Sequence, residues 1–159
     1  MMFVLARATT YSALFIGLLL LFLPGRILSS TGIIQPAAIG GWQGAGMLVG
    51  ASGAALALAC ILTFVFVGKG TPAPFDPPRR LVVQGPYRFV RNPMYLGAGC
   101  ALAGAALFYQ SIPLLGYAAV FLLITHLFVV WYEEPTLRRI FDGDYEAYRR
   151  RVGRWWPRS

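Results

Sequence analysis

The chain has 159 residues, enough for a single domain, and 57% of them are apolar while only 13% are charged. A soluble domain carries about twice that share of charge, so the composition indicates an integral membrane protein. The net charge of +8 is concentrated between residues 69 and 91 and after residue 137, which favours a cytoplasmic face and anionic headgroups as partners. Nucleic acid is not favoured as a partner, because no recognisable binding module accompanies the charge.

The choice of residue types adds two smaller points. Thirteen of the fourteen basic residues are Arg, and Ala and Gly are abundant, which is typical of a GC-rich bacterial genome. Cys60 and Cys100 both fall inside apolar segments, with no second ligand type at metal-binding spacing. We interpret both as small packing residues, and we predict no metal site.

Two apolar segments occupy the N-terminal half of the chain. The first runs from about residue 8 to 28; its apolar centre is as short as that of a signal peptide, but no convincing cleavage site follows it, so we predict a retained helix. Residues 29–41 form a loop almost without charge, which suits the non-cytoplasmic side. The second segment, residues 42–67, is long enough to span, and Gly46, Gly50 and Ala54 form a stripe that permits close helix packing.

Residues 68–92 form the one substantial polar connection. Its first part is too rich in proline for a helix, so we predict a cytoplasmic covering loop with a short extended piece at Leu81-Val82-Val83. Its end, GPYRFVRNPMYLG at residues 85–97, leads into a third apolar segment at 94–109. Asn92 suits an N-cap and Pro93 the first helical turn. The local chemistry fits a headgroup anchor and an anion or cofactor site at the helix N-terminus equally well.

The third segment and the fourth, residues 113–132, are joined by the short turn Gln110-Ser111 and form an antiparallel hairpin. Asn92 and Glu133 lie at similar distances from this turn along the two arms. At about 1.5 Å of rise per residue, the two positions return to nearly the same depth. We therefore predict that Asn92-Pro93-Met94-Tyr95 meets Tyr132-Glu133-Glu134-Pro135 on one side of the membrane.

The tail, residues 135–159, has an amphipathic pattern. Apolar and aromatic residues recur at helical spacing opposite a face of arginines, with a break near Asp142-Gly143-Asp144. We predict an interfacial helix on an anionic leaflet. The fold class is therefore all-α: residues 1–159 form one polytopic membrane domain with four transmembrane helices and a C-terminal amphipathic interfacial helix. Both termini are expected on the cytoplasmic side of a bacterial inner membrane.

Three polar residues near the end of the fourth span carry the candidate chemistry. Glu133 and Glu134 stand where burying a charge is costly and usually indicates a partner. Either a carboxylate binds a cationic or hydroxyl-rich ligand, or the acids pair with arginines at 91, 138 or 139 or cap the next helix; the sequence favours neither. His126 shares the helix face of Glu133 at about 10 Å, where it serves either as a general base or in one interhelical hydrogen bond.

These elements together resemble the isoprenylcysteine carboxyl methyltransferase and phospholipid methyltransferase superfamily. The matching parts are residues 85–97, the hairpin, Glu133-Glu134-Pro135 with Leu137, and the tail positions Phe141, Tyr145, Tyr148, Val152 and Trp156-Pro157. They cover residues 79–157 and must occur in this order around a hairpin, which makes the pattern specific. No Gly-x-Gly-x-x-Gly follows a strand, so a Rossmann-type cofactor fold is not indicated.

The resemblance implies S-adenosylmethionine as the cofactor. The residues that match the family's cofactor site are Arg79, Arg80, Leu81, Val82, Tyr87, Asn92, Pro93, Met94, Tyr95 and Glu133. The resemblance also implies methyl transfer to a lipophilic, membrane-embedded substrate, as in isoprenylcysteine methyltransferases, with phospholipid amine N-methylation as the alternative. A base is needed if the acceptor arrives protonated, and His126, Glu134 and bulk water are the candidates.

Two departures from the family pattern bear on the reaction. The family commonly has His where this chain has Asn92, so a titrating imidazole is missing there. The prenylcysteine enzymes have a substrate-contacting Arg where this chain has Val129, which disfavours a carboxylate substrate. A hypothesis of another class is a non-catalytic membrane scaffold whose basic tail binds anionic lipid or a partner, but it leaves the paired acids and the polar loop unexplained.

Overall fold

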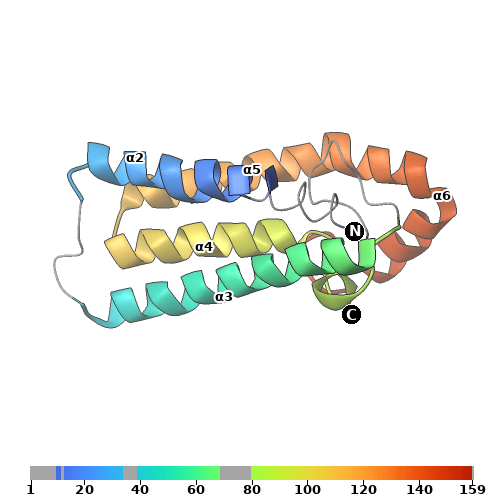
Figure 1. Ribbon diagram of the computed structural model, residues 1–159, viewed down its shortest axis with the longest axis horizontal. Coiled ribbons are helices and arrows are strands. Elements are labelled where there is room, and N and C mark those ends of the chain that lie inside the picture. Colours follow the sequence, from blue (N-terminus) through green and yellow to red (C-terminus); the bar gives the residue numbers. More distant parts are fainter. Residues whose placement is uncertain (1–9, 12, 34–38, 69–79, 159) are drawn as a thin grey trace.

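The computed structural model describes residues 10, 11, 13–33, 39–68 and 80–158, and every regular element in these ranges is a helix. The long helices lie side by side along one axis (Figure 1): η1 (Ile16–Phe22) with α2 (Leu23–Ser30), then α3 (Gly41–Thr63), α4 (Pro93–Tyr109) and α5 (Ile112–Phe128). The π-helical turns η2 (Phe64–Gly68) and η4 (Val129–Glu133) extend α3 and α5, and α6 (Glu134–Arg151) continues from η4. A short 3-10 turn, η3 (Gly85–Arg88), precedes α4. The predicted all-α fold is confirmed.

Within the described ranges, three helices are long and apolar enough to cross a membrane: Ala13–Ser30, Gly41–Gly68 and Ile112–Arg151. The sequence predicted four, and the third predicted span is the exception. It forms α4, whose 17 residues extend about 25 Å, less than a hydrocarbon core of roughly 30 Å. Pro93 begins this helix and Gln110, in the left-handed conformation at φ 50°, ends it. The last predicted span does not end at residue 132, because its helix runs on into α6.

Helices α3 and α4 pack with their backbones in contact. A Cβ on Gly53 would lie 2.5 Å from the carbonyl oxygen of Gly97, so a larger residue has no room there. The predicted close packing by small residues is confirmed, but Ala54 is exposed and Gly53 takes its place. The reason is helical period: two turns take about 7.2 residues, so Gly53 stays on the face of Gly46 while a step of eight drifts off it.

The first helix packs against the hairpin through a mainly apolar core. Ala98 and Leu102 of α4 and Ala118 and Phe121 of α5 form this core, with partly buried residues of the first helix against it. The Tyr117 hydroxyl adds one polar contact, donating to a carbonyl oxygen of η1 at 2.9 Å. The bundle is therefore held from both sides of α4, by α3 and by α5.

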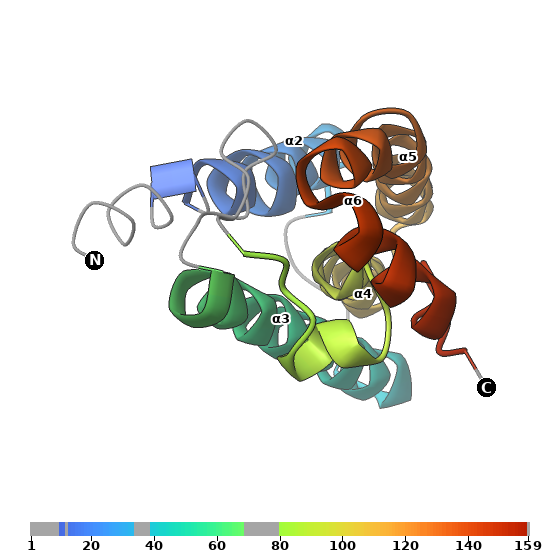
Figure 2. The same ribbon diagram turned by 90° about the vertical axis from the view of Figure 1, so that its right-hand side faces the viewer.

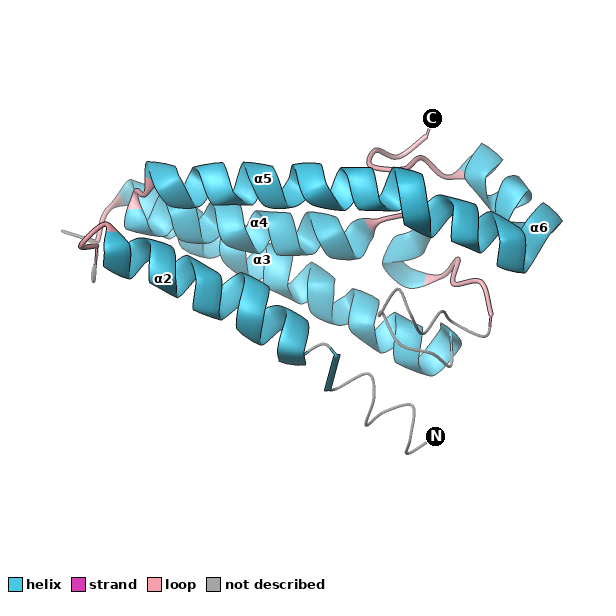
Figure 3. Cartoon of the chain, turned by 90° about the horizontal axis from the view of Figure 1, so that it is seen from above, coloured by secondary structure: helices cyan, strands magenta, loops and turns pink. Residues whose placement is uncertain are grey.

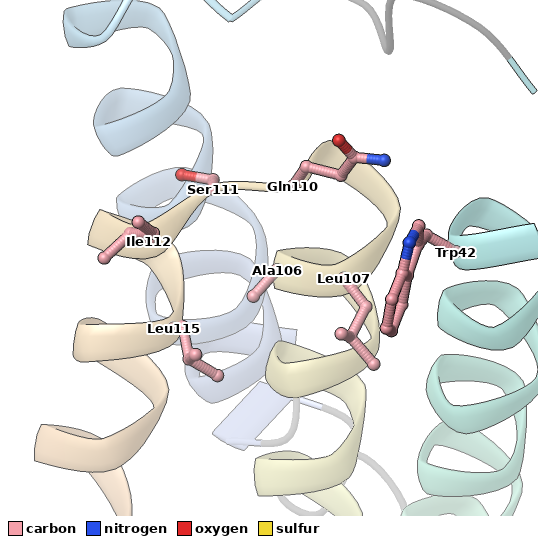
Figure 4. Close-up of a pocket in the computed structure, with 7 residues that line it drawn as sticks. All are labelled: Trp42, Ala106, Leu107, Gln110, Ser111, Ile112 and Leu115. Atoms are coloured by element: carbon pink, nitrogen blue, oxygen red, sulfur yellow. The ribbon is translucent and has the colours of Figure 1, made fainter.

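The hairpin turn forms one end of the bundle, which we call the turn end. Ser111 caps α5 there by accepting a hydrogen bond from the Leu114 N–H at 3.3 Å. A mainly apolar cavity of about 300 Å³ opens beside the turn, between Trp42 of α3 and residues of α4 and α5 (Figure 4). This cavity lies at the far end of the hairpin from Glu133 and takes no part in the site described below.

The opposite end, which we call the loop end, is covered by α6. Its backbone leaves the helical conformation at Asp142 (φ 39°, ψ −116°), so the predicted break is confirmed, and the second half turns back across the bundle (Figure 2). Tyr145, Tyr148 and Val152 are buried there, with Leu81, Leu137 and Phe141 packed against them. These residues of the apolar face therefore pack on the protein itself, whereas Ile140 of the same face is exposed. Figure 3 shows the C-terminal segment returning beside the end of α5.

Candidate active site

Tyr95, one turn into α4, and Glu133, the last residue of η4, meet at the loop end. The Tyr95 hydroxyl donates a hydrogen bond to Oε2 of Glu133 at 3.1 Å. The two residues are 38 positions apart, so this bond confirms that the hairpin arms return to one depth. Tyr95 is buried and Glu133 is partly exposed.

The two neighbouring acids point in different directions from their helix. Successive residues of a helix point about 100° apart, so adjacent side chains can face different surroundings. Glu133 ends η4 and faces Tyr95, whereas Glu134 begins α6 and faces the polar loop and the tail. Adjacent acids thus acquire different partners.

Glu134 is buried, 4% exposed, in a cluster with two arginines. Arg154 donates from Nε to Oε1 at 2.6 Å and from Nη2 to Oε2 at 3.0 Å, and Nη1 of Arg91 lies 3.1 Å from Oε1. The hydrogen bonds to Glu134 raise the pKa of Arg154 above its usual value. The pairing interpretation of Glu134 is confirmed for Arg91. The second arginine is Arg154, which the sequence did not indicate, and Arg138 pairs with Glu146 instead.

The polar loop is tied to the C-terminal segment. The Arg91 N–H donates to the carbonyl oxygen of Gly153 at 2.9 Å, beside an isolated parallel bridge. Tyr148 donates from its hydroxyl to the carbonyl oxygen of Tyr87 at 2.6 Å, and Nη1 of Arg91 donates to the Tyr145 hydroxyl at 2.9 Å. These bonds seat residues 87–91 on the tail.

Asn92 occupies the predicted N-cap position of α4, but its side chain does not cap the helix. Its amide Nδ2 donates instead to the carbonyl oxygen of Arg154 at 3.3 Å. The first N–H groups of α4 therefore lack a side-chain cap. Pro93 is fully buried, and Met94 packs against Tyr87 and its neighbours.

Tyr87 joins the loop to α3. It is buried with Cys60 and Val82, and its ring meets that of Phe64 edge to face at 5.2 Å between centroids. Burial raises the pKa of Tyr87 well above its usual value, and the nearby Cys60 thiol and Glu133 carboxylate raise it further. Tyr87 is thus a neutral phenol within electrostatic reach of Glu133.

The other predicted loop residues lie in different surroundings. Val82 is buried beside Tyr87, Leu81 packs on the aromatic residues of α6, and Arg80 is exposed. Arg79 lies outside the described residues. The structure thus places Val82 and Leu81 in the packing that supports Tyr87 and the tail.

His126 is engaged by the C-terminal segment. The Trp155 indole N–H donates to Nδ1 of His126 at 2.9 Å, and the two ring centroids are 5.9 Å apart. A neutral imidazole has one donor and one acceptor nitrogen, so this bond assigns the proton to Nε2. Val129, one turn further, is fully buried.

Reasoning from the sequence missed Arg154 and the role of Trp155. Arg154 lies past the end of α6, off its helical period, and looks like one more member of a basic C-terminal cluster. The available signal was Gly153, which interrupts the amphipathic pattern directly before it. Glycine allows a close approach of the chain here, because a Cβ on Gly153 would overlap the carbonyl oxygen of Trp156.

Comparison with known families agrees with this arrangement. The phospholipid methyltransferase family model matches residues 42–144, which include α3, the polar loop, the hairpin and the first half of α6. No curated protein and no solved structure gives a match. The family match covers well over half of the chain. The chain therefore belongs to the phospholipid methyltransferase family, within the superfamily of integral membrane methyltransferases.

Proposed function

We propose that the chain transfers a methyl group from S-adenosylmethionine to the amine of a membrane phospholipid, with Glu133 receiving positive charge in the site. The observation that carries this proposal is the different state of the two acids. Glu134 is neutralised by two arginines, whereas the described partner of Glu133 is the neutral phenol of Tyr95. A partly exposed carboxylate with spare lone pairs attracts a cation.

The residues at the loop end fit the amino-acid part of this cofactor. Its ammonium and sulfonium groups are cations that suit Glu133. Its carboxylate suits the N-terminus of α4, whose first N–H groups have no side-chain cap. Nε of Arg91 adds a third sign, because it is buried without a hydrogen-bond partner among the described residues, and an orphaned donor indicates a place for an acceptor.

We assign the cofactor to the residues that the sequence motif singled out. They are Tyr87, Asn92, Pro93, Met94, Tyr95 and Glu133, with Arg80, Leu81 and Val82 contributed by the loop. Arg79 belongs to the same assignment from the sequence motif alone. The polar atoms of Tyr95 and Glu133 and the backbone N–H groups of residues 94 and 95 are the direct ligands in this proposal, while the buried loop side chains support them.

The charges at the loop end favour an amine over a carboxylate as the methyl acceptor. Glu133 would repel a carboxylate, and the positive charges of Arg91 and Arg154 are already balanced in part by Glu134, although Nε of Arg91 has no acceptor in the described part of the chain. Val129 offers no charge either, since it is a buried valine. An S-prenylated cysteine with a free carboxylate is therefore the less suitable substrate. A protonated amine matches Glu133.

The chain's part in the reaction is positioning and the exclusion of water. When bound, S-adenosylmethionine supplies an electrophilic methyl group on a sulfonium. Tyr95 orients the Glu133 carboxylate, and an ammonium substrate must lose a proton before it attacks. Both oxygens of Glu134 are held by arginines and Nδ1 of His126 by Trp155, so we assign the proton to solvent water at the partly exposed Glu133.

We further propose that the loop end faces the cytoplasm of a bacterial cell. The arginines outside the apolar helices gather there, in η3, α6 and the C-terminal segment, as the positive-inside rule requires. Exposed basic residues such as Arg139 and Arg150 are placed to meet anionic headgroups. The lipid substrate would enter sideways from the bilayer.

Binding of labelled S-adenosylmethionine to the purified protein tests the cofactor. We expect the wild type and Glu146→Gln, which alters an exposed ion pair, to bind alike, and Glu133→Gln to bind at least tenfold more weakly. Absence of binding by the wild type would refute the methyltransferase and, together with salt-dependent binding to anionic vesicles, would favour the scaffold.

Methyl transfer to defined vesicles tests the substrate. We expect labelled methyl groups in phosphatidylethanolamine, whose headgroup is a primary amine, and none in phosphatidylglycerol, which has no amine. An S-prenylated cysteine with a free carboxylate serves as the third substrate. Transfer to that compound and not to the amine lipid would contradict the proposed acceptor while leaving the cofactor assignment intact.

A further inference from the structure

The C-terminal segment Gly153–Trp155, which we call the return segment, lies against the site although it follows the part of the chain matched by the family model. Gly153 accepts from the Arg91 N–H, Arg154 binds Glu134 through two hydrogen bonds, and Trp155 donates to His126. Each of these contacts joins a residue inside the family match, residues 42–144, to a residue of the return segment outside it. The return segment is a separate contribution to the loop end.

The return segment runs along the helix that carries the acids. Its consecutive residues Arg154 and Trp155 reach Glu134 and His126, which are eight positions, or about two helical turns, apart. The segment therefore lies antiparallel to this stretch of α5, η4 and α6, and it covers the helix next to Glu133.

Arg154 controls the groups around Glu133 through three links. Its guanidinium holds both oxygens of Glu134, the same carboxylate binds the buried Arg91, and its own carbonyl oxygen accepts from Asn92 at the start of α4. A bidentate arginine fixes the orientation of a carboxylate as well as its charge. All three linked residues border the site proposed above.

We infer that Arg154 is a positioning residue of the methyl-transfer site: it keeps Glu134 neutralised and the loop at residues 87–92 seated, so that Glu133 is the carboxylate left to receive a cation. Without the guanidinium of Arg154, Glu134 retains one arginine and becomes a competing, misplaced carboxylate. The backbone carbonyl of residue 154, which accepts from Asn92, is then no longer held in place by the side chain of its own residue. This inference rests on the proposed function, and it assigns to the proposed site a residue that lies outside the family match.

The test compares Arg154→Gln and Arg154→Lys with Arg158→Gln in the full-length protein. Arg158 is the matched control, because it is exposed and binds the carbonyl oxygens of Arg149 and Arg150. We expect Arg154→Gln to weaken S-adenosylmethionine binding about tenfold while the KM for phosphatidylethanolamine changes less than about threefold. Lysine keeps the charge but not the paired geometry, so Arg154→Lys should recover part of the affinity.

A double-mutant cycle asks whether Arg154 acts through Glu134. If it does, Glu134→Gln combined with Arg154→Gln should bind the cofactor no more weakly than the worse single variant. If the losses of cofactor-binding free energy in the two single variants add up in the double variant, the inference is overturned. It is also overturned if Arg154→Gln binds the cofactor as tightly as Arg158→Gln does. If Arg154→Gln does not fold, Arg154→Lys carries the same comparison.

Hydrogen exchange gives a readout that needs no cofactor. The Arg91 amide is held by Gly153, so peptides covering residues 85–97 should exchange faster in Arg154→Gln than in Arg158→Gln. Equal exchange would overturn the positioning role. If the wild type fails to bind S-adenosylmethionine, the proposed function fails, and faster exchange in Arg154→Gln would still support the seating of the loop by this residue.

Discussion

Trp155 donates its indole N–H to Nδ1 of His126 across 29 positions of sequence, and this contact assigns the imidazole proton to Nε2. The residue that sequence reasoning offered as a general base is thereby a hydrogen-bond acceptor for the C-terminal segment. The contact also places the end of the chain beside the helix that carries Glu133. Both consequences can be measured.

Replacing His126 should lower methyl transfer by less than about tenfold, because its lone pair is engaged and solvent accepts the proton. Loss of a general base would cost about 10²- to 10⁴-fold instead. The turnover number of His126→Gln and its pH profile decide between the two. A hundredfold lower turnover number, together with disappearance of the acidic limb of the pH profile, would identify His126 as the base.

The tautomer of His126 can be observed directly. The chain has one histidine, so ¹⁵N labelling gives a single pair of ring resonances. We expect an acceptor-type Nδ1 and a protonated Nε2 in the wild type, and a changed Nδ1 resonance in Trp155→Phe, which lacks the donor. Trp156→Phe is the matched control, since Trp156 is exposed. An unchanged resonance in Trp155→Phe would contradict the hydrogen bond.

Tyr95→Phe should weaken S-adenosylmethionine binding roughly fivefold to tenfold, because the aromatic ring remains while the Glu133 carboxylate loses the hydrogen bond that orients it. Equilibrium binding of the labelled cofactor measures this. Tyr132→Phe serves as the control, since its side chain is exposed and stacks on Phe128. An equal affinity in both variants would separate Tyr95 from the site.

Glu134→Gln should destabilise the fold by about 3 kcal/mol, because it leaves the buried guanidinium of Arg91 without its counter-charge. Thermal unfolding in detergent or nanodiscs measures the loss. Glu146→Gln removes more exposed ion pairs and should cost less than about 1 kcal/mol. Similar losses in the two variants would show that the buried cluster contributes no more than a surface pair.

Gly53→Ala should reduce stability by at least about 2 kcal/mol, because the new methyl group meets the backbone of α4 and the helices must separate. Gly44→Ala, on the same helix, has open space around the new Cβ and should be neutral or slightly stabilising through helix propensity. Unfolding temperatures of the two variants provide the comparison. Equal behaviour would contradict the contact between α3 and α4.

Reasoning from sequence went far with the helices and the hairpin. The run of apolar residues, the short turn at Gln110-Ser111 and the equal arm lengths predicted that Asn92 and Glu133 reach one level, and the bond between Tyr95 and Glu133 confirms it. The break near Asp142 was also predicted, whereas the pairing of Glu134 was one of two alternatives that the sequence left open. These features depend on local residue types and on the constant rise of a helix, both of which can be read along the chain.

The sequence predicted one long span too many, and it did not show what the tail contacts within the protein. The sequence placed both ends of α4 correctly, with Pro93 in its first turn and Gln110 in the turn that follows, but it counted a helix of only 17 residues as a full span. An amphipathic pattern states that one face is buried without stating in what, and Tyr145 and Tyr148 pack on the polar loop. For the tail, the missing information was the neighbour across space.

By itself, the sequence of this protein determined the membrane class, the helical hairpin and the meeting of the polar loop with the acidic pair, because periodicity and helix length are local properties. Only the tertiary structure decided which acid is neutralised. That choice depends on the hairpin, which brings Tyr95 to Glu133, and on the return segment, which brings Arg154 to Glu134 over 20 positions. Partners brought together by folding, and not the identical carboxylates themselves, give these two neighbours their different surroundings.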